Sequence, residues 1–166
     1  DADSDGAPLI ALTGQVSTNK MHITAHQFLD LVQLFEPITK RSKQIVEPAS
    51  VNEIIRLAFK YAESEKPGAC HIDLPVNIAK LPVEESEKPL IRRQLPVELP
   101  SENAIKVAVD TINKAKRPVI LAGNGAVRAH AEKALTLFSN LLKIPVINTM
   151  MAKGVIPFDD PYSMWT

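Results

Sequence analysis

The sequence predicts an α/β protein with parallel, doubly wound sheets, in which parts of two consecutive domains are joined by a proline-rich linker. Short apolar runs alternate with segments of helical periodicity, and glycine or polar side chains follow most of these runs directly. This alternation is typical of parallel strands joined by right-handed helical crossovers. It stops between residues 81 and 100, where prolines and charged residues accumulate, so we expect one domain part over residues 1–80 and a second over 101–166.

The composition is that of a globular protein. The chain has 166 residues, 45% of them hydrophobic, and its 19 Lys and Arg balance 19 Asp and Glu. A net charge near zero gives no electrostatic reason to expect nucleic acid or a membrane as a partner, and no apolar run approaches the roughly 20 residues that span a bilayer. The single cysteine, Cys70, excludes an internal disulfide and favours a cytoplasmic setting. The chain begins at Asp1 and stops at Thr166 after a turn-like segment, so we expect both ends to be cuts in a longer protein.

The first predicted element is a buried strand over residues 9–12. Thr13, Gly14 and Gln15 follow it at once, and apolar residues succeeded by glycine and polar side chains are typical of the carboxyl end of a parallel strand. In open α/β sheets ligands bind outside this edge. We therefore expect any site of the chain to be built from such strand ends.

A helix is expected next, over residues 25–35. Thr24 and Gln27 fit a capping box, in which both side chains satisfy free amides of the first turn, and Pro37 ends the helix. The expected apolar stripe consists of Phe28, Leu31, Val32 and Phe35. A short extended passage follows, over residues 38–40 and then 43–46.

The clearest helical pattern starts at Ser50, which with Glu53 fits a second capping box. The apolar positions that follow keep helical spacing over about three turns: Val51, Ile54, Ile55, Ala58, Phe59 and Ala62. Residues 69–74 then read as a strand that ends near Asp73. Three strands alternating with two helices make up the expected first unit.

The second unit begins with a helix that Ser101 caps. A strand over residues 119–122 leads to Gly123-Asn124-Gly125, another helix follows, and a strand over residues 145–147 comes last. Two strands and two helices are too few for a complete domain of this kind, so we expect its remainder beyond residue 166.

No spacing of side chains identifies a metal centre, because the four histidines are scattered along the chain. Gly123-Asn124-Gly125, between a strand and a helix, could bring backbone amides to a phosphate. However, Arg128 stands where the dinucleotide fingerprint has its third glycine. The segment is therefore either a ligand-binding turn or merely a tight turn.

Several polar residues have one structural and one functional interpretation. Gln27 could contact a substrate or cofactor from a helix N-terminus, but a capping box explains it without a ligand. His26 beside it could be a surface histidine, and Lys40 could steer an anionic substrate or be simply solvated. Asp73 could bind a ligand or cap the following turn, whereas His71 is expected to be a packed strand residue.

Six segments, taken in order, resemble one family of enzymes. They are PLIALTGQV, the start AHQ of the expected helix, LFEPITKRS, AFKYAESEKPGACHIDLPVNI, RPVILAGNGAV and IPVINTMMAKGVIPFDDP. In this order they resemble the thiamine-diphosphate-dependent acetolactate synthases and their pyruvate oxidase relatives. The resemblance runs over nearly the whole chain, and the ordered set is far more specific than any one segment.

The resemblance implies a subunit with a pyrimidine-binding, a central and a diphosphate-binding domain. This chain would cover the end of the first, the linker and the start of the second. The implied chemistry joins two pyruvates into 2-acetolactate and CO2, as in branched-chain amino acid biosynthesis, with thiamine diphosphate and Mg2+ in a homodimer or homotetramer. The family's activating glutamate and its Gly-Asp-Gly metal motif would lie outside these 166 residues, so we expect this chain alone to be inactive.

The resemblance also suggests roles for individual residues. Gly14 and Gln15 match a family loop at the pyrimidine-side edge near the subunit interface. Gln27, next to His26, matches a glutamine that faces the active site, and Lys40 matches a lysine near the substrate entrance. No metal ligand is expected in this chain.

Two departures bear on FAD. The biosynthetic, flavin-containing enzymes usually have Phe where this chain has His26 and Arg where it has Glu36, so the chain looks more like the flavin-free catabolic synthases. Yet Gly123-Asn124-Gly125 still resembles the flavin-binding turn of the central domain, which leaves FAD doubtful but open. The alternatives are a pyruvate oxidase or another 2-ketoacid enzyme of this group, a non-catalytic nucleotide-binding module that uses the same turn, and a scaffold without a ligand.

Overall fold

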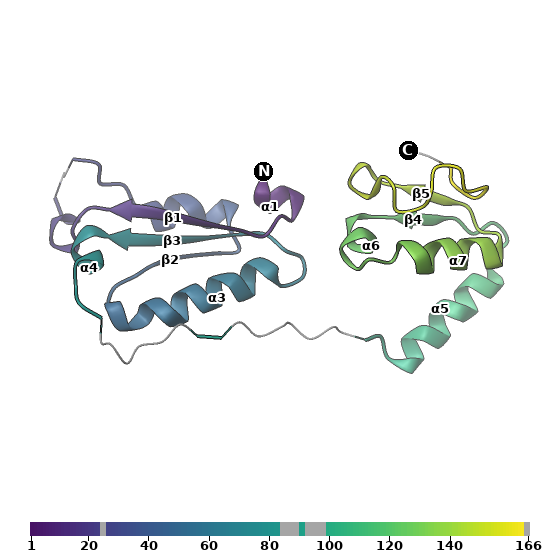
Figure 1. Cartoon of the computed structure of the whole chain (residues 1–166), viewed down its shortest axis with the longest axis horizontal. Helices are drawn as coiled ribbons and strands as arrows, with labels where there is room; N and C mark the ends of the chain where they lie inside the picture. The colour runs from purple at the N-terminus through teal and green to yellow at the C-terminus, as the bar shows by residue number, and fades with distance from the viewer. Residues whose placement is uncertain (24–25, 84–89, 92–98, 165–166) are drawn as a thin grey trace. The chain divides into compact units, whose positions relative to one another are not determined.

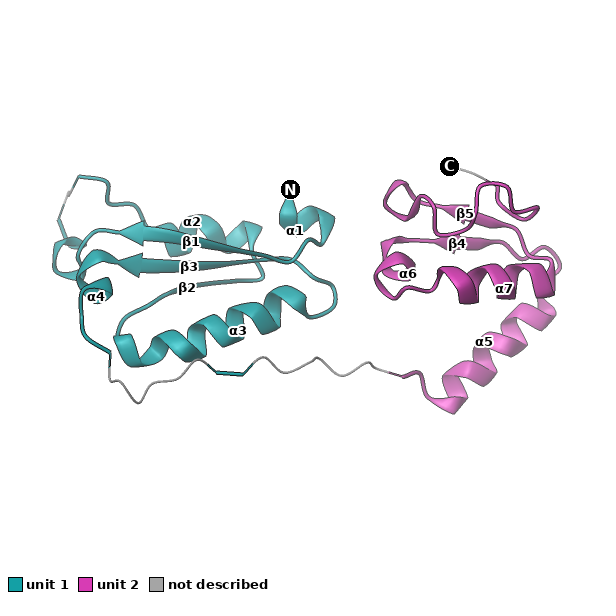
Figure 2. Ribbon diagram, in the orientation of Figure 1, with its two compact units in different colours: residues 1–97 teal, residues 98–166 magenta. Residues whose placement is uncertain are grey.

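The computed structural model describes the chain except for residues 24–25, 84–89, 92–98 and 165–166. The chain divides into two compact units, Asp1–Val97 and Glu98–Thr166 (Figure 2). Most of the predicted linker lies outside the described residues, so the expected domain limits stay a prediction. Each unit contains a parallel sheet with helices, which confirms the predicted α/β class.

The sheet of unit 1 has three parallel strands in the order β1-β3-β2 (Figure 1). These are β1 (Leu9–Gln15), β2 (Arg41–Gln44) and β3 (Ala69–Pro75). β1 continues three residues beyond its predicted end, and β2 begins between the two parts of the predicted extended passage, overlapping only its second part. In the register, Gln15 is opposite Pro75 and Gln44 is opposite Asp73, so the three carboxyl ends form one edge of the sheet.

The two faces of this sheet differ in chemistry. α3 (Val51–Glu63) packs on one face, where its Ala58 and Ala62 join a buried cluster with Cys70 and Ile72 of β3. Because side chains alternate along a strand, His71 and Asp73 point to the opposite face. α2 (Leu31–Phe35) packs there, with Phe35 stacked on His71. One face is therefore apolar, whereas the other buries polar side chains.

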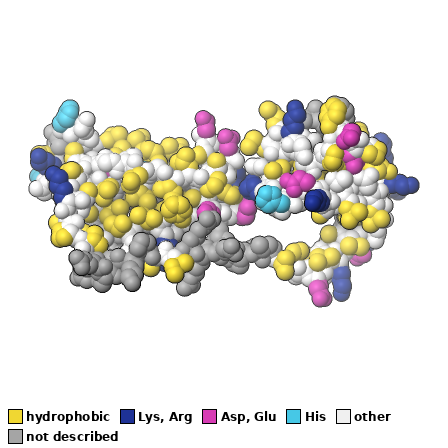
Figure 3. Space-filling view, viewed as in Figure 1, with side chains coloured by type: hydrophobic (Ala, Val, Ile, Leu, Met, Phe, Trp, Pro, Cys, Tyr) yellow, Lys and Arg dark blue, Asp and Glu magenta, His cyan; other side chains and the backbone are white. Residues whose placement is uncertain are grey.

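An apolar groove of about 400 Å3 remains between α3 and the β1 side of the sheet. Hydrophobic side chains gather on this part of unit 1 in the space-filling view (Figure 3). The lining consists of Ile10, Leu12, Ile45, Pro48, Val51, Ile55, Phe59, Ile72, Leu74, Ile78, Ala79, Leu81 and Val83. Since no polar side chain among the described residues lines the groove, these residues offer nothing that would fix a charged ligand.

The predicted helix over residues 25–35 is wrong in its first half. α2 begins only at Leu31, and Gln27 lies in a turn with a φ of 63°, which is outside the right-handed helical region. Asp30 is the observed N-cap, because its side chain accepts a hydrogen bond of 2.9 Å from the backbone N–H of the third helical residue. Thr24, the other half of the predicted capping box, lies outside the described residues.

The second predicted capping box does not form either. α3 starts where expected, but Ser50 belongs to η3 (Pro48–Ser50), a 3-10 turn that leads directly into the helix. Its Oγ donates a hydrogen bond of 2.8 Å to the carbonyl oxygen of Glu47 instead of accepting one from the helix. A serine that is already in helical conformation cannot act as the half-in residue of a cap.

Four shorter elements complete unit 1: α1 (Ala2–Asp5), η1 (Thr18–Lys20), η2 (Glu36–Ile38) and α4 (Val76–Ala79). η2 contains Pro37, and α2 ends before it as predicted. α1 closes at Gly6, whose φ of 66° lies in the left-handed region that glycine adopts most easily.

Unit 2 has a two-stranded parallel sheet of β4 (Ile120–Ala122) and β5 (Val146–Asn148). Its other elements are α5 (Glu102–Lys114), α6 (Asn124–Arg128), α7 (Glu132–Leu142) and η4 (Met150–Ala152). The predicted cap of α5 is confirmed, because Ser101 Oγ accepts a hydrogen bond of 3.2 Å from the N–H of Ala104. The core of this unit consists of Ala122, Val146, Ala152, Val155 and Ile156.

Candidate functional site

The carboxyl ends of the three strands in unit 1 border a cavity of about 210 Å3, which we call the edge pocket. β1 contributes Gln15, β2 contributes Gln44 and β3 contributes Asp73. The rest of the lining comes from α2, its cap and the segment before it: Met21, Phe28, Asp30, Leu31 and Val32. This is the sheet edge at which the sequence places a ligand site, and it combines apolar walls with a polar floor.

Asp73 forms the floor of the edge pocket. Its side chain is fully buried, and both carboxylate oxygens have donors. Thr13 Oγ1 lies 3.1 Å from Oδ1, and Gln44 Nε2 lies 2.7 Å from Oδ2. These bonds offset the cost of burying the carboxylate. Asp73 therefore connects all three strands, and its described side-chain bonds go to β1 and β2 rather than to the turn after β3.

His71 lies two residues before Asp73 on the same face and is 1% exposed. Its Nε2 is 2.8 Å from Thr13 Oγ1, and its Nδ1 is 2.7 Å from Ser42 Oγ. Burial lowers the pKa of His71, and the Asp73 carboxylate offsets part of this effect. The ring is therefore neutral at neutral pH, packed within the strand as the sequence predicts.

Gln15 is held by hydrogen bonds within the protein. Its side chain is 6% exposed, and its Nε2 donates a bond of 2.7 Å to the carbonyl oxygen of Leu29. Its Oε1 accepts a bond of 3.0 Å from the N–H of Val16. Gln15 thus fixes the loop above the edge pocket, and its assignment as a direct cofactor contact stays a prediction.

Gly14 is exposed at the carboxyl end of β1. A Cβ built on it would meet no atom within 4 Å, and its φ is not in the left-handed region. Neither backbone conformation nor packing within unit 1 therefore requires glycine at this position. The open position leaves room for a ligand or another surface to approach the backbone closely.

The loop after β1 carries His26 and Gln27, both exposed. The base of this loop is tied to the turn after β3 by two hydrogen bonds. The Thr18 N–H donates a hydrogen bond of 3.0 Å to Asn77 Oδ1, and Asn77 Nδ2 donates one of 2.9 Å to Thr18 Oγ1. The loop thus starts from the same sheet edge as the edge pocket, although neither His26 nor Gln27 is among the residues that line the cavity.

Lys40 lies at the opposite end of the sheet, immediately before β2. Its Nζ donates hydrogen bonds of 2.8 Å to the carbonyl oxygens of Ser64 and Lys66, and its backbone N–H donates to Ala69. Within unit 1 the structure therefore does not bring Lys40 together with Gln15 or the edge pocket. Its role at a substrate entrance stays a prediction.

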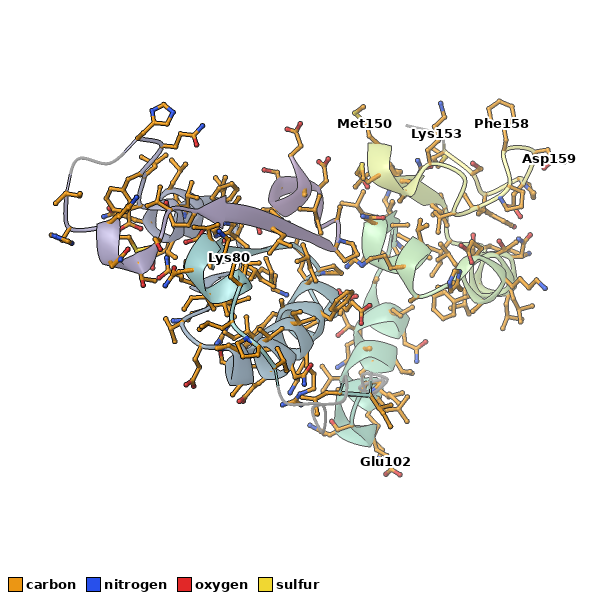
Figure 4. The ribbon with its side chains drawn as sticks, turned by 60° about the vertical axis from the view of Figure 1, so that its left-hand side comes forward. Lys80, Glu102, Met150, Lys153, Phe158 and Asp159 are labelled. Atoms are coloured by element: carbon orange, nitrogen blue, oxygen red, sulfur yellow. The ribbon has the colours of Figure 1, made fainter. Side chains whose placement is uncertain are left out.

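The predicted turn Gly123-Asn124-Gly125 follows β4 and opens α6, as expected. A Cβ on Gly123 would meet no atom within 4 Å, and one on Gly125 would meet only the Arg128 guanidinium, at 3.9 Å. The same carboxyl edge of unit 2 carries the segment after β5, from which Met150 and Lys153 project outward, with Phe158 and Asp159 further along (Figure 4). Met150 is 87% exposed.

Within the described ranges of the chain, no group of three or more His, Cys, Asp or Glu side chains could hold a metal ion. Cys70 is completely buried, and burial raises the pKa of its thiol, so this cysteine is a packing residue rather than a nucleophile. No helix in the described part of the chain is long and apolar enough to cross a membrane.

Sequence reasoning missed Thr13, Ser42 and Gln44, which complete the polar face. The signal that could have found them is strand parity: Thr13 and Gln15 alternate on β1 as His71 and Asp73 do on β3. A period of two in polar residues, on strands whose other face is apolar, indicates a buried polar layer. The missing information was the register that aligns the strands.

The chain is similar in sequence to proteins of known family. Residues 105–166 match the family model described as thiamine pyrophosphate enzyme, central domain. The probable acetolactate synthase large subunit of Methanococcus aeolicus is 38% identical over 168 residues, which cover 98% of this chain and 28% of that protein. The chain belongs to the thiamine-diphosphate-dependent acetolactate synthase family.

Other relatives of this acetolactate synthase family chain are similar over the same region. Glyoxylate carboligase of Escherichia coli O157:H7 is 32% identical over 160 residues, covering 95% of this chain and 27% of that protein. The acetolactate synthase large subunit of Corynebacterium glutamicum is 31% identical over 159 residues, covering 95% of this chain and 25% of that protein. The chain thus spans between a quarter and three tenths of the length of these relatives.

Proposed function

We propose that the protein containing these residues is an acetolactate synthase, which condenses two molecules of pyruvate into 2-acetolactate and CO2. The observation that carries this proposal is the 38% identity with a probable acetolactate synthase large subunit over 98% of the chain. A relative named glyoxylate carboligase supports the joining of 2-ketoacid units as the reaction class. We expect the 166 residues alone to be inactive and the complete enzyme to be a homodimer or homotetramer.

The carboxyl edge of unit 1 fits the thiamine diphosphate that this family uses. A cofactor can approach the backbone at Gly14, because no described residue occupies the place where a Cβ would stand. His26 and Gln27 are exposed in the loop that leaves the same edge, so their side chains are available to a ligand. Thiamine diphosphate, held with Mg2+, would supply the electron sink for the loss of CO2 from a 2-ketoacid.

The residues of this chain would then orient the bound cofactor and shield it from water. The Gln15 carboxamide holds the segment near Leu29 through the bond to its carbonyl oxygen, and the paired bonds of Thr18 and Asn77 hold the base of the loop. These contacts keep the Gly14 backbone in one place. Positioning of this kind lowers the entropic cost of reaching the reactive geometry.

We propose that the enzyme does not need FAD for its reaction. Glu36, which starts η2, carries a negative charge, and this charge would repel the diphosphate of a flavin bound nearby. The open space at Gly123 and Gly125 supports the alternative, because both positions admit a closely approaching ligand. FAD would then serve as a structural group at the turn after β4.

Reconstitution of the full-length enzyme tests these proposals. The apoenzyme is incubated with pyruvate while thiamine diphosphate, Mg2+ and FAD are each left out in turn. We expect 2-acetolactate and CO2 whenever thiamine diphosphate and Mg2+ are both present, with or without FAD. Absence of acetolactate under all conditions would contradict the proposed reaction, and an absolute requirement for FAD would contradict the flavin-free proposal.

Pyruvate oxidase is the second candidate function, favoured by the glycine turn at Gly123 that is open to a flavin. The same incubation, supplied with phosphate as co-substrate and with O2 as oxidant, separates the two. Acetyl phosphate formed from pyruvate, phosphate and O2, with obligatory flavin, indicates the oxidase, whereas acetolactate formed without flavin indicates the synthase.

A further inference from the structure

The buried polar face of unit 1 contains a continuous series of hydrogen bonds that crosses all three strands. In order, it joins Ser42 Oγ, His71 Nδ1, His71 Nε2, Thr13 Oγ1 and Asp73 Oδ1, at 2.7, 2.8 and 3.1 Å between successive groups. The second oxygen of Asp73 accepts a further bond of 2.7 Å from Gln44 Nε2, where the series reaches the edge pocket.

The donor and the acceptor of each hydrogen bond in this series follow from the Asp73 carboxylate at its end. An ionised carboxylate only accepts, so Thr13 must donate its single hydroxyl hydrogen to Asp73. Thr13 Oγ1 can then only accept from His71, which requires the proton on Nε2. A neutral ring protonated on Nε2 has a lone pair on Nδ1, so Ser42 must donate to it.

The same logic fixes the side chain of Gln44. Because Asp73 Oδ2 only accepts, the NH2 group of the carboxamide faces Asp73 and the Oε1 atom faces away. Among the described residues no buried side-chain polar atom lacks a partner, and no hydrogen bond is formed by Gln44 Oε1. This oxygen is therefore accessible, and Gln44 is one of the residues that line the edge pocket.

We propose that His71 is a positioning residue for the edge pocket: its neutral ring, protonated on Nε2, orients Thr13 and Asp73 so that Gln44 presents a carbonyl acceptor beside the cavity. The ligand class that this arrangement accepts is a neutral or cationic group with an N–H or O–H donor. The carboxylates of Asp73 and Asp30 in the lining disfavour an anion, so the carboxylate of a 2-ketoacid substrate is not the group that enters. The hydrogen-bond directions stand on the structure alone, whereas any consequence for catalysis rests on the proposed function.

The direct test is the tautomer of His71, read by solid-state NMR of the intact protein labelled with 15N-histidine. The His71 signals are assigned as those that disappear in His71→Gln. We expect the proton on Nε2 and an unprotonated Nδ1 at pH 7.5. A proton on Nδ1 would overturn the proposal, because the ring would then donate to Ser42 and Thr13 would donate to His71 instead of to Asp73.

The functional test compares Thr13→Val with Thr13→Ser in the full-length enzyme. Thr13→Val removes the hydroxyl between His71 and Asp73, whereas Thr13→Ser keeps it. We expect Thr13→Val to raise the half-saturating concentration of thiamine diphosphate, which carries an amino group, roughly tenfold, the equivalent of one weakened hydrogen bond at a charged group, and Thr13→Ser to stay within about twofold of the wild type. Thr111→Val, which removes an exposed threonine hydroxyl from α5, is the matched control and should leave this concentration unchanged.

Equal constants for Thr13→Val and the wild type would overturn the positioning role while leaving the tautomer assignment intact. If the enzyme makes no acetolactate at all, the proposed function fails, and the NMR measurement still decides the direction of the hydrogen bonds. The two failures are therefore distinguishable.

Discussion

The ring of His71 on β3 lies face to face with the ring of Phe35 on α2, with centroids 4.1 Å apart and an interplanar angle of 9°. This stack closes the polar face of the sheet from above, while Thr13 and Ser42 bind the two ring nitrogens from the sides. An imidazole confined in this way is stable in the neutral form, because a charge would have to be buried with it. The pH dependence of stability and the effect of Phe35→Leu follow from this arrangement.

The first prediction concerns the pH dependence of stability. The pKa of His71 is lowered in the folded protein, whereas it is about 6.5 in the unfolded chain. Below about pH 6.5 the unfolded chain therefore binds the proton more readily, so the contribution of His71 is complete above this pH and is lost as the pH falls towards the folded pKa. Urea unfolding at several pH values should show that the free energy of unfolding falls more steeply towards acid pH in the wild type than in His71→Gln. The two slopes should differ by at most about 1.4 kcal/mol per pH unit, the limit for this one group. Parallel curves for the two proteins would contradict the prediction.

The second prediction concerns Phe35→Leu. Leucine keeps an apolar side chain at the end of α2 but removes the stacked ring, so we expect unit 1 to lose about 1 kcal/mol of stability. Water should also reach the imidazole, so the pKa of His71 should rise towards its ordinary value. NMR titration of the histidine ring in both proteins measures this shift, and an unchanged pKa would show that the stack does not control the burial of the ring.

The third prediction compares two glycines. A Cβ on Gly68 would lie 2.9 Å from Asp3 Oδ1 and 3.0 Å from Lys40 Cδ, so Gly68→Ala should displace the lysine whose Nζ bonds to Ser64 and Lys66. We expect a loss of about 1 kcal/mol, since flexible side chains can yield. Gly14→Ala has open space and should change stability by less than about 0.5 kcal/mol. Thermal unfolding of both variants tests this ranking.

Gly14→Ala also tests the site. If a cofactor approaches the backbone of Gly14, this variant should bind thiamine diphosphate roughly tenfold more weakly in the full-length enzyme while its stability is unchanged. Unchanged binding would remove Gly14 from the cofactor-binding residues.

The fourth prediction concerns the cap of α5. Ser101 Oγ accepts the only side-chain cap bond described for this helix, so Ser101→Ala should destabilise unit 2 by about 1 kcal/mol. Ser101→Asp keeps an acceptor at the same position and should restore most of this loss. Circular dichroism during urea unfolding measures both variants, and equal losses for Ala and Asp would argue against the cap.

How far the sequence predicts this fold depends on what each signal measures. Apolar runs bounded by glycine and polar residues located β1, β3, β4 and β5, because burial of a parallel strand leaves a strong local pattern. β2 has no apolar residue, so the predicted extended passage overlapped it only in part. The helix over residues 25–35 was predicted too long, because Phe28 has the right spacing and the pattern cannot show that Gln27 takes a left-handed φ. The cap at Asp30, two residues after Phe28, was the better local signal.

The candidate site was only partly predictable. Gly14 and Gln15 could be placed at a strand end from the sequence, but the contacts of Asp73 with Thr13 and Gln44 depend on residues 60 and 29 positions away. Such pairs are fixed by strand order and register, which a single sequence does not contain. For the same reason the sequence could not show that Lys40 lies at the other end of the strands from the edge pocket, and its role at a substrate entrance stays a prediction.

The measurement that tests the central claim most directly is the product formed by the full-length enzyme from 13C-labelled pyruvate, followed by NMR. With thiamine diphosphate and Mg2+ present, and no flavin added, we predict labelled 2-acetolactate and CO2 in a ratio of one to one. Labelled acetyl phosphate, or pyruvate left unchanged, would contradict the assignment of this chain to an acetolactate-forming enzyme.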